Sequence, residues 1–415
     1  MKRSFITLFI IAFISPASFC QTTKRALFLG NSYTDFNNVP QITANIAHSM
    51  GDSLYFEKNA PGGYTLQGHS VNSTSVNKIK QGSWNFVVLQ EQSQLPSYPI
   101  DTVQLQVYPF AHFLDSMINV YNNCCETMFY MTWGRKNGDA SNCGWWPPVC
   151  TYEGMDSLLY ERYMTMTYDN NAVVSPVGRV WKYIRQIYPS IELYNPDESH
   201  ASVAGSYAAA CCFYTCMFRK DPRAITFDNA LPAMDAANIR TAVKNIVYDS
   251  LIRWQVGKYD PVAAFDIITG TGNQVGFINS STNANNYFWD FGDNNTSADI
   301  NPVHTYTREG NYTVKLTASN NCNDSVVLTK FVATGIQQIA TGIYPNPVTD
   351  YLYVEIENLK APSISMFNSI GQRLSLKSTT AGNKIRIDLT SLPSGVYFIN
   401  MLIGEKIFTQ KIIKK

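Results

Sequence analysis

The chain has 415 residues, of which 45% are hydrophobic and 15% charged, and its formal net charge is +1. This length predicts two to four domains with enough apolar material for buried cores. A net charge so close to zero provides no field that would attract nucleic acid or an anionic membrane surface, so neither is expected as a partner.

Residues 1–20 have the pattern of a secretory signal peptide. Lys2 and Arg3 precede the apolar run FITLFIIAFI, and the small residues of SPASFC follow before Gln21. The apolar run is about half as long as a membrane-spanning helix, and no later segment has the pattern of one. Cys20 is the alternative, as a lipid-anchored cysteine, but Phe19 directly before it fits that reading poorly. We therefore expect an exported chain that is secreted or attached to the cell surface.

Residues 24–256 alternate between short apolar runs and longer segments with helical spacing. RALFLG, WNFVVLQ and ETMFYMTW have the pattern of buried strands, and segments such as VPQITANIAHSMG follow them with helical spacing. This alternation predicts an α/β domain whose parallel sheet is covered by helices on both faces. The carboxyl ends of parallel strands open onto one crevice, so polar residues just beyond these runs are candidates for a functional site.

Eight of the nine cysteines follow residue 20, and export makes disulfides chemically possible. Cys143 and Cys150 flank GWWPPV and are candidates for a disulfide that closes this loop. No paired C-x-x-C pattern is repeated, so we expect no metal site. Cys211, Cys212 and Cys216 stand in the apolar segment SYAAACCFYTCMF, which favours buried small side chains.

Residues 260–333 and 340–415 have a different residue pattern from the first domain. In both segments β-branched and aromatic residues alternate between turn-forming clusters of Asn, Gly, Thr and Ser, and no helical period is present. The pattern predicts two small all-β sandwiches.

Ser32 stands in LFLGNSYT, just beyond the first predicted strand, where a turn residue is the default interpretation. His200 stands in NPDESHASVAGSY, a turn-rich loop before an apolar helix, and Asp197 precedes it by three residues. That spacing allows the carboxylate to orient one ring nitrogen while the other points into the crevice. The alternative is an ordinary helix start, in which Ser199 or Ser202 is the cap. His48 and His112 lie within helix patterns, and His304 lies in the later β-region.

Three segments in this order resemble the SGNH or GDSL hydrolase superfamily over residues 25–220. FLGNSYT resembles its first block, NAPGGYTLQGHS its second and DESHASVAGSY its last. The resemblance implies a flavodoxin-like three-layer sandwich with a parallel sheet, and a serine-esterase mechanism without a cofactor or metal. Carried over to this chain, Ser32 is the nucleophile, His200 the general base and Asp197 the group that orients it.

The resemblance also implies oxyanion donors, and here the sequence departs from the family pattern twice. The donors would be the backbone amides of Ser32 and of Gly62 or Gly63. Asn31 stands where the family has an aspartate, and VVLQEQS stands where it has Gly-x-Asn. Gln90 or Gln92 carries a side-chain amide that can replace that asparagine, and Gln90 is preferred because it is nearer the strand end. QEQS resembles the Gln-Gly-Glu-like string of carbohydrate-ester branches.

The aromatic insert TWGRKNGDASNCGWWPPVCTY bears on the substrate. Trp145 and Trp146 are candidates for stacking on sugar rings, and loop packing around Pro147 and Pro148 is the alternative. The superfamily includes esterases that deacetylate polysaccharides as well as lipases and lysophospholipases. Export and the aromatic loop favour a carbohydrate ester, or a small ester, as substrate.

The later segments resemble two known modules. WDFGD and PVHTYTREGNYTVKLTA resemble the PKD domain, a spacer or binding unit, in which we expect Trp289 in the core. Asp290 and Asp293 could bind calcium, but turn-capping is favoured. YPNPVTDYLYVEI and LPSGVYFINM resemble the type IX (Por) secretion sorting domain of Bacteroidetes, which implies the outer-membrane secretion machinery as a partner; a generic sandwich is the alternative.

The function predicted from these features is that of a secreted serine esterase that hydrolyses acyl esters, acetyl esters above all, on a polysaccharide or glycan. The alternative is a surface glycan-binding or adhesion protein whose first domain is catalytically inactive.

Overall fold

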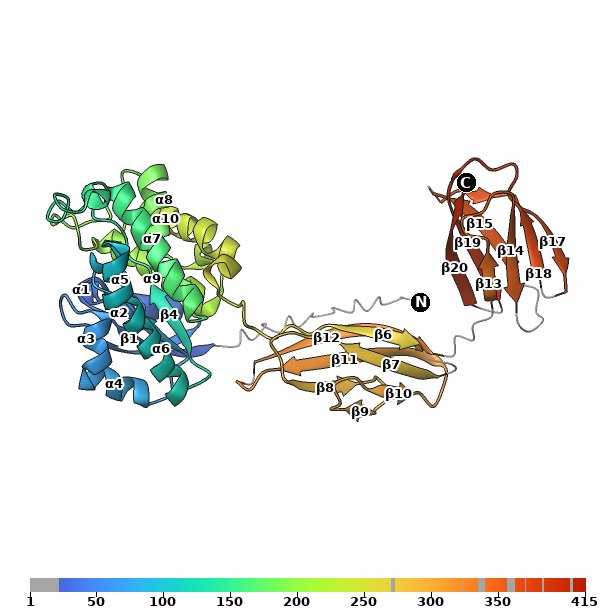
Figure 1. Cartoon of the computed structure of the whole chain (residues 1–415), viewed down its shortest axis with the longest axis horizontal. Coiled ribbons are helices and arrows are strands. Elements are labelled where there is room, and N and C mark those ends of the chain that lie inside the picture. The colour runs from blue at the N-terminus through green and yellow to red at the C-terminus, as the bar shows by residue number, and fades with distance from the viewer. Residues whose placement is uncertain are drawn as a thin grey trace, which may run out of the picture. The chain divides into compact units, whose positions relative to one another are not determined.

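The computed structural model describes residues 22–269, 273–322, 324–334, 340–356, 363–369, 371–382, 384–403 and 406–415. The predicted signal peptide, residues 1–20, lies outside the described residues. The chain divides into two compact units, Met1–Asp260 and Pro261–Lys415 (Figure 1).

The first unit is built on a five-stranded parallel sheet with the order β2-β1-β3-β4-β5. This is the strand order of flavodoxin-like doubly wound folds, in which ligand sites lie beyond the carboxyl ends of the strands. The prediction of a parallel α/β sandwich is therefore confirmed. The strands are β1 (Thr23–Leu29), β2 (Ser53–Asn59), β3 (Phe86–Leu89), β4 (Glu126–Tyr130) and β5 (Val173–Ser175).

Helices form two groups around this sheet, and the members of each group pack on one another. One group contains α2, α8, α9 and α10, and the other contains α3, α4, α6 and α7. Because both faces are covered, the central strand β3 is buried along its whole length, and so is the short edge strand β5. The helices are α1 (Ser32–Asp35), α2 (Val39–Ser49), α3 (Leu66–Val71), α4 (Ser73–Lys80), α5 (Ile100–Gln106), α6 (Tyr108–Tyr121), α7 (Tyr152–Asp169), α8 (Val177–Ile187), α9 (Val203–Phe218) and α10 (Ala233–Ile246).

Helix α9 is the most completely buried of the described helices that pack around the sheet. Every residue after Val203 in this helix is buried, because apolar and small side chains surround its whole circumference. Phe213 meets Phe28 of β1 edge to face, with ring centroids 5.3 Å apart. Cys211, Cys212 and Cys216 are buried free thiols, which confirms their prediction as core side chains.

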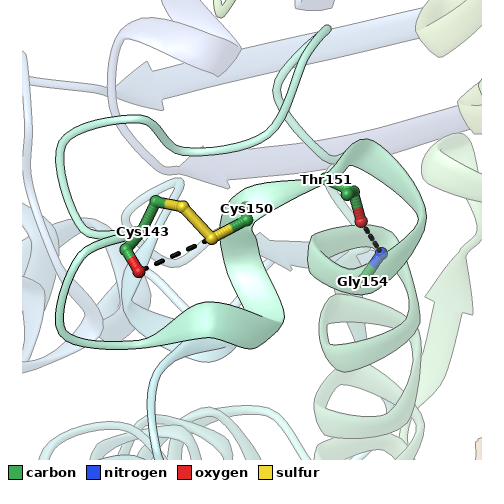
Figure 2. The surroundings of a disulfide bond; sticks show 4 residues. All are labelled: Cys143, Cys150, Thr151 and Gly154. Atoms are coloured by element: carbon green, nitrogen blue, oxygen red, sulfur yellow. Dashed lines mark hydrogen bonds between the residues drawn. A yellow bond between two sulfur atoms is a disulfide. The ribbon is translucent and has the colours of Figure 1, made fainter.

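The loop between β4 and α7 is closed by the disulfide Cys143–Cys150, as predicted (Figure 2). The helix that follows begins with a cap, in which Thr151 Oγ1 accepts a hydrogen bond of 3.1 Å from the Gly154 amide. The buried carboxylate of Asp139 fixes the start of the same loop. It accepts hydrogen bonds from Gln94 Nε2 (2.7 Å), Asn142 Nδ2 (2.6 Å) and Arg135 Nη1 (3.1 Å).

The second unit contains two β-sandwiches, each with its own core. In the first sandwich the sheets β10-β7-β6 and β12-β11-β8-β9 enclose Trp289, whose Nε1 donates to the Asp299 carbonyl over 2.9 Å, so its predicted core position is confirmed. Asp290 and Asp293 accept backbone amides of the following turn, as favoured from the sequence. The strands are β6 (Phe265–Thr269), β7 (Gln274–Asn279), β8 (Asn286–Asp290), β9 (Thr296–Ser297), β10 (Val303–Thr305), β11 (Gly310–Ser319) and β12 (Ser325–Thr334).

The second sandwich pairs the sheets β13-β14-β18-β17 and β16-β15-β19-β20. Its core includes Leu352 and Val354 from one sheet and Ile399 and Met401 from the other. No helix in the described part of the chain is long and apolar enough to cross a membrane. The strands are β13 (Ala340–Tyr344), β14 (Tyr351–Ile356), β15 (Ser363–Asn368), β16 (Arg373–Leu374), β17 (Lys377–Ala381), β18 (Lys384–Asp388), β19 (Gly395–Ile403) and β20 (Lys406–Lys414).

The disulfide gives a prediction for stability. Replacing both Cys143 and Cys150 by serine should lower the free energy of unfolding of the first unit by roughly 2 kcal/mol. The reason is that the cross-link reduces the conformational entropy of the unfolded chain over a loop of about eight residues. Urea unfolding followed by tryptophan fluorescence measures the change. Equal midpoints for the wild type and the double variant would contradict it.

Candidate active site

The turn after β1 presents Ser32 at the start of a short helix. Ser32 is the first residue of α1, and Asn31 caps this helix because its Oδ1 accepts a hydrogen bond of 3.1 Å from the Tyr33 amide. The first amides of a helix have no partner within it. Among the hydrogen bonds of the described residues, the amides of Asn31, Tyr33 and Thr34 all take part, whereas the Ser32 amide does not. The Ser32 N–H therefore remains available to an external acceptor.

Glycine is required just before this turn because of close packing. A Cβ on Gly30 would lie 2.3 Å from Thr34 Oγ1 and 2.6 Å from Gln90 Oε1, closer than real contacts allow. The missing side chain lets the strand end approach the Gln90 amide directly.

The three side chains proposed for catalysis meet at the carboxyl edge of the sheet. His200 Nε2 lies 2.8 Å from Ser32 Oγ, and His200 Nδ1 is hydrogen bonded to Asp197 Oδ2. The other carboxylate oxygen of Asp197 accepts the amides of Ser199 (3.0 Å) and His200 (2.9 Å). Partial burial alone would raise the pKa of Asp197, but the hydrogen bonds from the His200 ring and the two amides hold this pKa below its ordinary value. An ionised Asp197 fixes the tautomer in which Nε2 accepts the Ser32 proton.

The loop that carries His200 is held in place by stacked aromatic rings of the core. Tyr33 stacks on Trp133 with ring centroids 4.7 Å apart, and Trp133 stacks on Trp181 at 3.8 Å. Polar atoms of the first two rings bind the loop, because Tyr33 Oη lies 2.7 Å from Ser199 Oγ and Trp133 Nε1 donates to the Ser199 carbonyl over 3.0 Å. This support leaves the His200 ring little freedom to move away from Ser32.

A left-handed residue shapes the same loop. Glu198 has a φ of 59°, which is unfavourable for a residue with a side chain. Its carbonyl accepts the Lys136 amide over 2.9 Å, and its carboxylate accepts Asn137 Nδ2 at 3.0 Å on both oxygens. These contacts from the segment after β4 hold the sharp turn between Asp197 and His200.

The side-chain amide of Asn31 joins the Ser32 turn to two separate segments. Its Nδ2 donates to the carbonyls of Tyr64 (2.9 Å) and Glu91 (3.4 Å), and its Oδ1 accepts Gln90 Nε2 (2.8 Å) as well as the Tyr33 amide. An aspartate at this position could accept at one oxygen but has no hydrogen to donate to the two carbonyls. Asn31, which stands where the resembled superfamily has an aspartate, thus has neighbours that require a side-chain donor.

Gln90 and Gln92 are both engaged in local hydrogen bonds. The fully buried Gln90 accepts the Asn31 amide (3.0 Å) and the Thr34 hydroxyl (2.9 Å), and its Nε2 donates to Asn31 Oδ1 and to the Glu91 carbonyl (2.6 Å). Both hydrogens of the Gln90 amide are therefore committed to holding the turn, and donation to an oxyanion would break one of these bonds. Gln92 Oε1 accepts the amides of Gln94 (2.8 Å) and Leu95 (2.9 Å), at the start of the 3-10 turn η2 (Leu95–Ser97).

Gly62 and Gly63 lie in the loop between β2 and α3. Gly63 has a φ of 68°, which favours glycine, and a Cβ on Gly62 would meet no atom within 4 Å. The bond from Asn31 to the Tyr64 carbonyl fastens this loop beside the Ser32 turn. Their amides thus remain candidates for oxyanion donors.

The two tryptophans of the insert differ in accessibility. Trp146 is partly buried against the core, and its Nε1 donates to the Ser97 carbonyl over 2.9 Å. Trp145 is 54% exposed and meets Tyr98 edge to face at 5.4 Å. Trp146 thus has the packing role that was the alternative from the sequence, whereas Trp145 presents a ring to solvent.

Two buried ionisable residues near the Ser32 turn were not predicted from the sequence. His69 Nε2 donates to the Gly30 carbonyl over 2.8 Å, and its Nδ1 accepts from Ser75 Oγ at 2.7 Å. Burial lowers the pKa of His69 to about 4, so the ring is neutral. Glu91 accepts the Leu66 amide (3.1 Å) and the Gln92 amide (2.5 Å), and burial raises its pKa to about 8. The one signal in the sequence was the position of Glu91 directly after a predicted strand.

Comparison with known families identifies both modules of the second unit. Residues 260–333 match the PKD domain, and residues 342–415 match the secretion system C-terminal sorting domain. Both resemblances drawn from the sequence are confirmed. The sorting domain indicates secretion across the outer membrane or display at the cell surface.

Two curated proteins share shorter stretches with this chain. Ulvan lyase NLR42 of Nonlabens ulvanivorans is 34% identical over 80 residues, which are 19% of this chain and 15% of that protein. Collagenase ColQ1 of Bacillus cereus strain Q1 is 63% identical over 30 residues, which are 7% of this chain and 3% of that protein. The chain thus spans only a small part of either relative.

Solved structures include several that are similar to this chain. They include a DUF4886 family protein from Bacteroides uniformis (14% identity, 55% of this chain and 95% of that chain, TM-score 0.48). An SGNH hydrolase candidate from Slackia heliotrinireducens covers 47% of this chain and 100% of its own (22% identity, TM-score 0.39). The match to the esterase EstA from Pseudoalteromonas sp. covers 47% of this chain and 97% of that chain (11% identity, TM-score 0.33). The fold class of the first unit, a doubly wound parallel α/β sandwich, rests on the strand order and helix layers described above.

The raised pKa of Glu91 predicts a pH-dependent contribution to stability. Between about pH 4.5 and pH 8 the folded chain keeps a proton on Glu91 that the unfolded chain has lost, so this group makes the folded state less stable as the pH rises through that range. The slope is at most about 1.4 kcal/mol per pH unit. Glu91→Gln cannot titrate and should not show this contribution.

Urea unfolding of wild type and Glu91→Gln at pH 5, 6.5 and 8 tests this prediction. The free energy of unfolding of the wild type, relative to the variant, should fall from pH 5 to pH 8. A constant difference across the three pH values would contradict a buried carboxyl with a raised pKa.

Proposed function

We propose that this protein is a secreted serine esterase that hydrolyses acyl esters, in particular acetyl esters of a polysaccharide or glycan. The observation that carries the proposal is the continuous chain of hydrogen bonds from Ser32 Oγ through His200 to Asp197, beside an unused helix N-terminal amide. A serine hydroxyl is a poor nucleophile until an adjacent base takes its proton, and this chain supplies that base.

The proposed reaction has two halves. His200 Nε2 takes the Ser32 proton as Oγ attacks the ester carbonyl, and the resulting oxyanion accepts hydrogen bonds from the Ser32 amide and from Gly62 or Gly63. The tetrahedral intermediate collapses as His200 gives the proton to the leaving alkoxide, which departs as an alcohol. Water then attacks the acyl-enzyme with His200 as base again, and the carboxylic acid and the free Ser32 hydroxyl are released. Asp197 holds the ring and stabilises the imidazolium in both halves.

A carbohydrate ester is supported by two features. The sorting domain indicates action outside the cell, with the type IX secretion machinery as partner, and extracellular polysaccharides can carry acyl esters on their hydroxyl groups. Trp145 offers an exposed indole on a loop that the disulfide and Asp139 fix in place. Such rigid exposed aromatic rings are suited to ring stacking.

A glycan-binding protein with an inactive first domain is the second candidate. The PKD domain favours it, since such a module can act as a binding unit. It does not account for a serine within hydrogen-bond distance of an oriented histidine, because a binding surface needs neither. Turnover of an ester by the purified chain separates the two candidates.

Removing the nucleophile or its partners should abolish activity. We expect Ser32→Ala and Asp197→Asn each to lower kcat for p-nitrophenyl acetate by about 10³-fold or more, because they remove the nucleophile or the tautomer that activates it. Ser73→Ala, at the exposed start of α4, is the matched control and should retain full activity. If Ser32→Ala hydrolyses the ester as fast as the wild type, the proposal is wrong.

The Asn31 amide gives a second activity prediction. Asn31→Asp places an oxygen against the carbonyls of Tyr64 and Glu91 in place of their donor, so the loop with Gly62 and Gly63 should shift. We expect kcat to fall by about 10²-fold, the scale of one lost oxyanion donor. Asn45→Asp on α2 is the control, since the Asn45 side chain accepts from Gln41 through an oxygen that aspartate keeps. An Asn31→Asp variant with unchanged kcat would show that this amide does not position the site.

A further inference from the structure

A single exposed aromatic ring lies against the proposed catalytic histidine. Phe36 directly follows α1, its ring centroid is 5.2 Å from that of His200, and it is 41% exposed. The His200 side chain is 27% exposed, and this partly exposed phenyl ring lies beside it. We propose that Phe36 is the surface on which the leaving alcohol of the substrate rests, and that this alcohol is a sugar ring. The proposal rests on the esterase function given above and adds the position of the leaving group.

The backbone around Phe36 is held in an unfavourable form. Asn37 and Asn38 have φ values of 56° and 54°, so two consecutive residues with side chains occupy the left-handed region. Asn37 Nδ2 lies within hydrogen-bond distance of the carbonyls of Ala201 (3.0 Å) and Ser202 (3.2 Å) and of Ser206 Oγ (2.9 Å). The segment is therefore fastened to the loop and helix that follow His200, and Phe36 keeps its place beside the imidazole.

A second contact holds the other side of this segment. Lys58 Nζ, at the end of β2, binds the Asp35 carboxylate and lies 3.1 Å from Asn38 Oδ1. The polar side chains of Asp35 and Asn38, which stand one and two positions from Phe36 in the sequence, are thus held by Lys58. An apolar ring on a segment with polar side chains suits a sugar, whose C–H face is apolar and whose hydroxyls form hydrogen bonds at its edge.

The chemistry of the reaction determines which part of the substrate meets this ring. His200 must give its proton to the leaving oxygen, so the alcohol has to lie within hydrogen-bond reach of Nε2. The acyl carbonyl points instead toward the amides of Ser32 and Gly62 or Gly63. We therefore assign the exposed ring beside His200 to the alcohol part and not to the acyl part.

A purely supporting role for Phe36 is less consistent with its surroundings. Tyr33 already meets the His200 ring edge on from the buried side, with centroids 5.4 Å apart, and it is itself bound to Ser199. A second support would be expected to be buried, because an exposed phenyl ring forgoes the stabilisation that burial provides. Its exposure leaves the ring free to be covered by a bound group.

Hydrolysis of two acetyl esters with different alcohols tests the proposal. Glucose pentaacetate has a sugar as alcohol, and ethyl acetate has an alcohol too small to stack. We expect Phe36→Ala to lower kcat/KM for glucose pentaacetate about tenfold more than for ethyl acetate, and Phe36→Trp to restore the ratio. The ratio of kcat/KM between ethyl acetate and ethyl butyrate should stay the same in Phe36→Ala, because the acyl part lies elsewhere. Phe113→Ala, which removes another phenyl ring that is 50% exposed, on α6, is the matched control.

Each other outcome overturns the proposal in a recognisable way. Equal losses for glucose pentaacetate and ethyl acetate would assign Phe36 to support of His200. A changed ratio of acetate to butyrate would assign it to the acyl side, and unchanged kinetics would leave it no role. If the wild type hydrolyses none of the esters faster than Ser32→Ala does, the esterase function itself fails. If Ser32 is required and Phe36 is not, only the present inference fails.

Discussion

The hydrogen bonds of one side-chain amide, that of Asn31, determine how the parts of the candidate site are placed. A parallel sheet brings the ends of β1 and β3 to one edge. That placement alone would leave the loops more freedom of movement than catalysis tolerates. Asn31 caps the Ser32 helix, binds the Gln90 amide and holds the carbonyls of Tyr64 and Glu91. Two further segments, the loop with Tyr64 and the end of β3, are thereby fixed relative to the nucleophile.

Beneath this amide lies a layer of buried polar groups. Gln90 is saturated with hydrogen bonds, neutral His69 donates to the Gly30 carbonyl, and Glu91 accepts two backbone amides. Buried polar groups are stabilising only when each has a partner, and a satisfied network fixes one arrangement of its members. The strand ends at the site are therefore joined by directional bonds. His200 is held differently, by Asp197 and by the aromatic rings below its loop.

The fold and the order of the main elements could be predicted because periodicity and turn residues are local signals. The pair Cys143 and Cys150 could be proposed because only seven positions separate them. Ser32 and His200 are 168 positions apart, and only a resemblance to a family placed them in one site before the structure did. Gln90 was assigned an oxyanion role because sequence shows an amide but not the direction of its hydrogens. Phe36 carried no signal, since its position depends on left-handed asparagines and on contacts with a distant loop.

The central claim is that Ser32 is the nucleophile, and covalent trapping tests it most directly. A fluorophosphonate reacts only with a serine that is activated by a base, and it leaves a stable phosphonyl ester on that oxygen. Peptide mass mapping after treatment of the full chain should find one adduct, on the peptide that contains Ser32, and Asp197→Asn should form it much more slowly. An adduct on another serine, or none on the wild type under conditions that label an active serine esterase, would contradict the account.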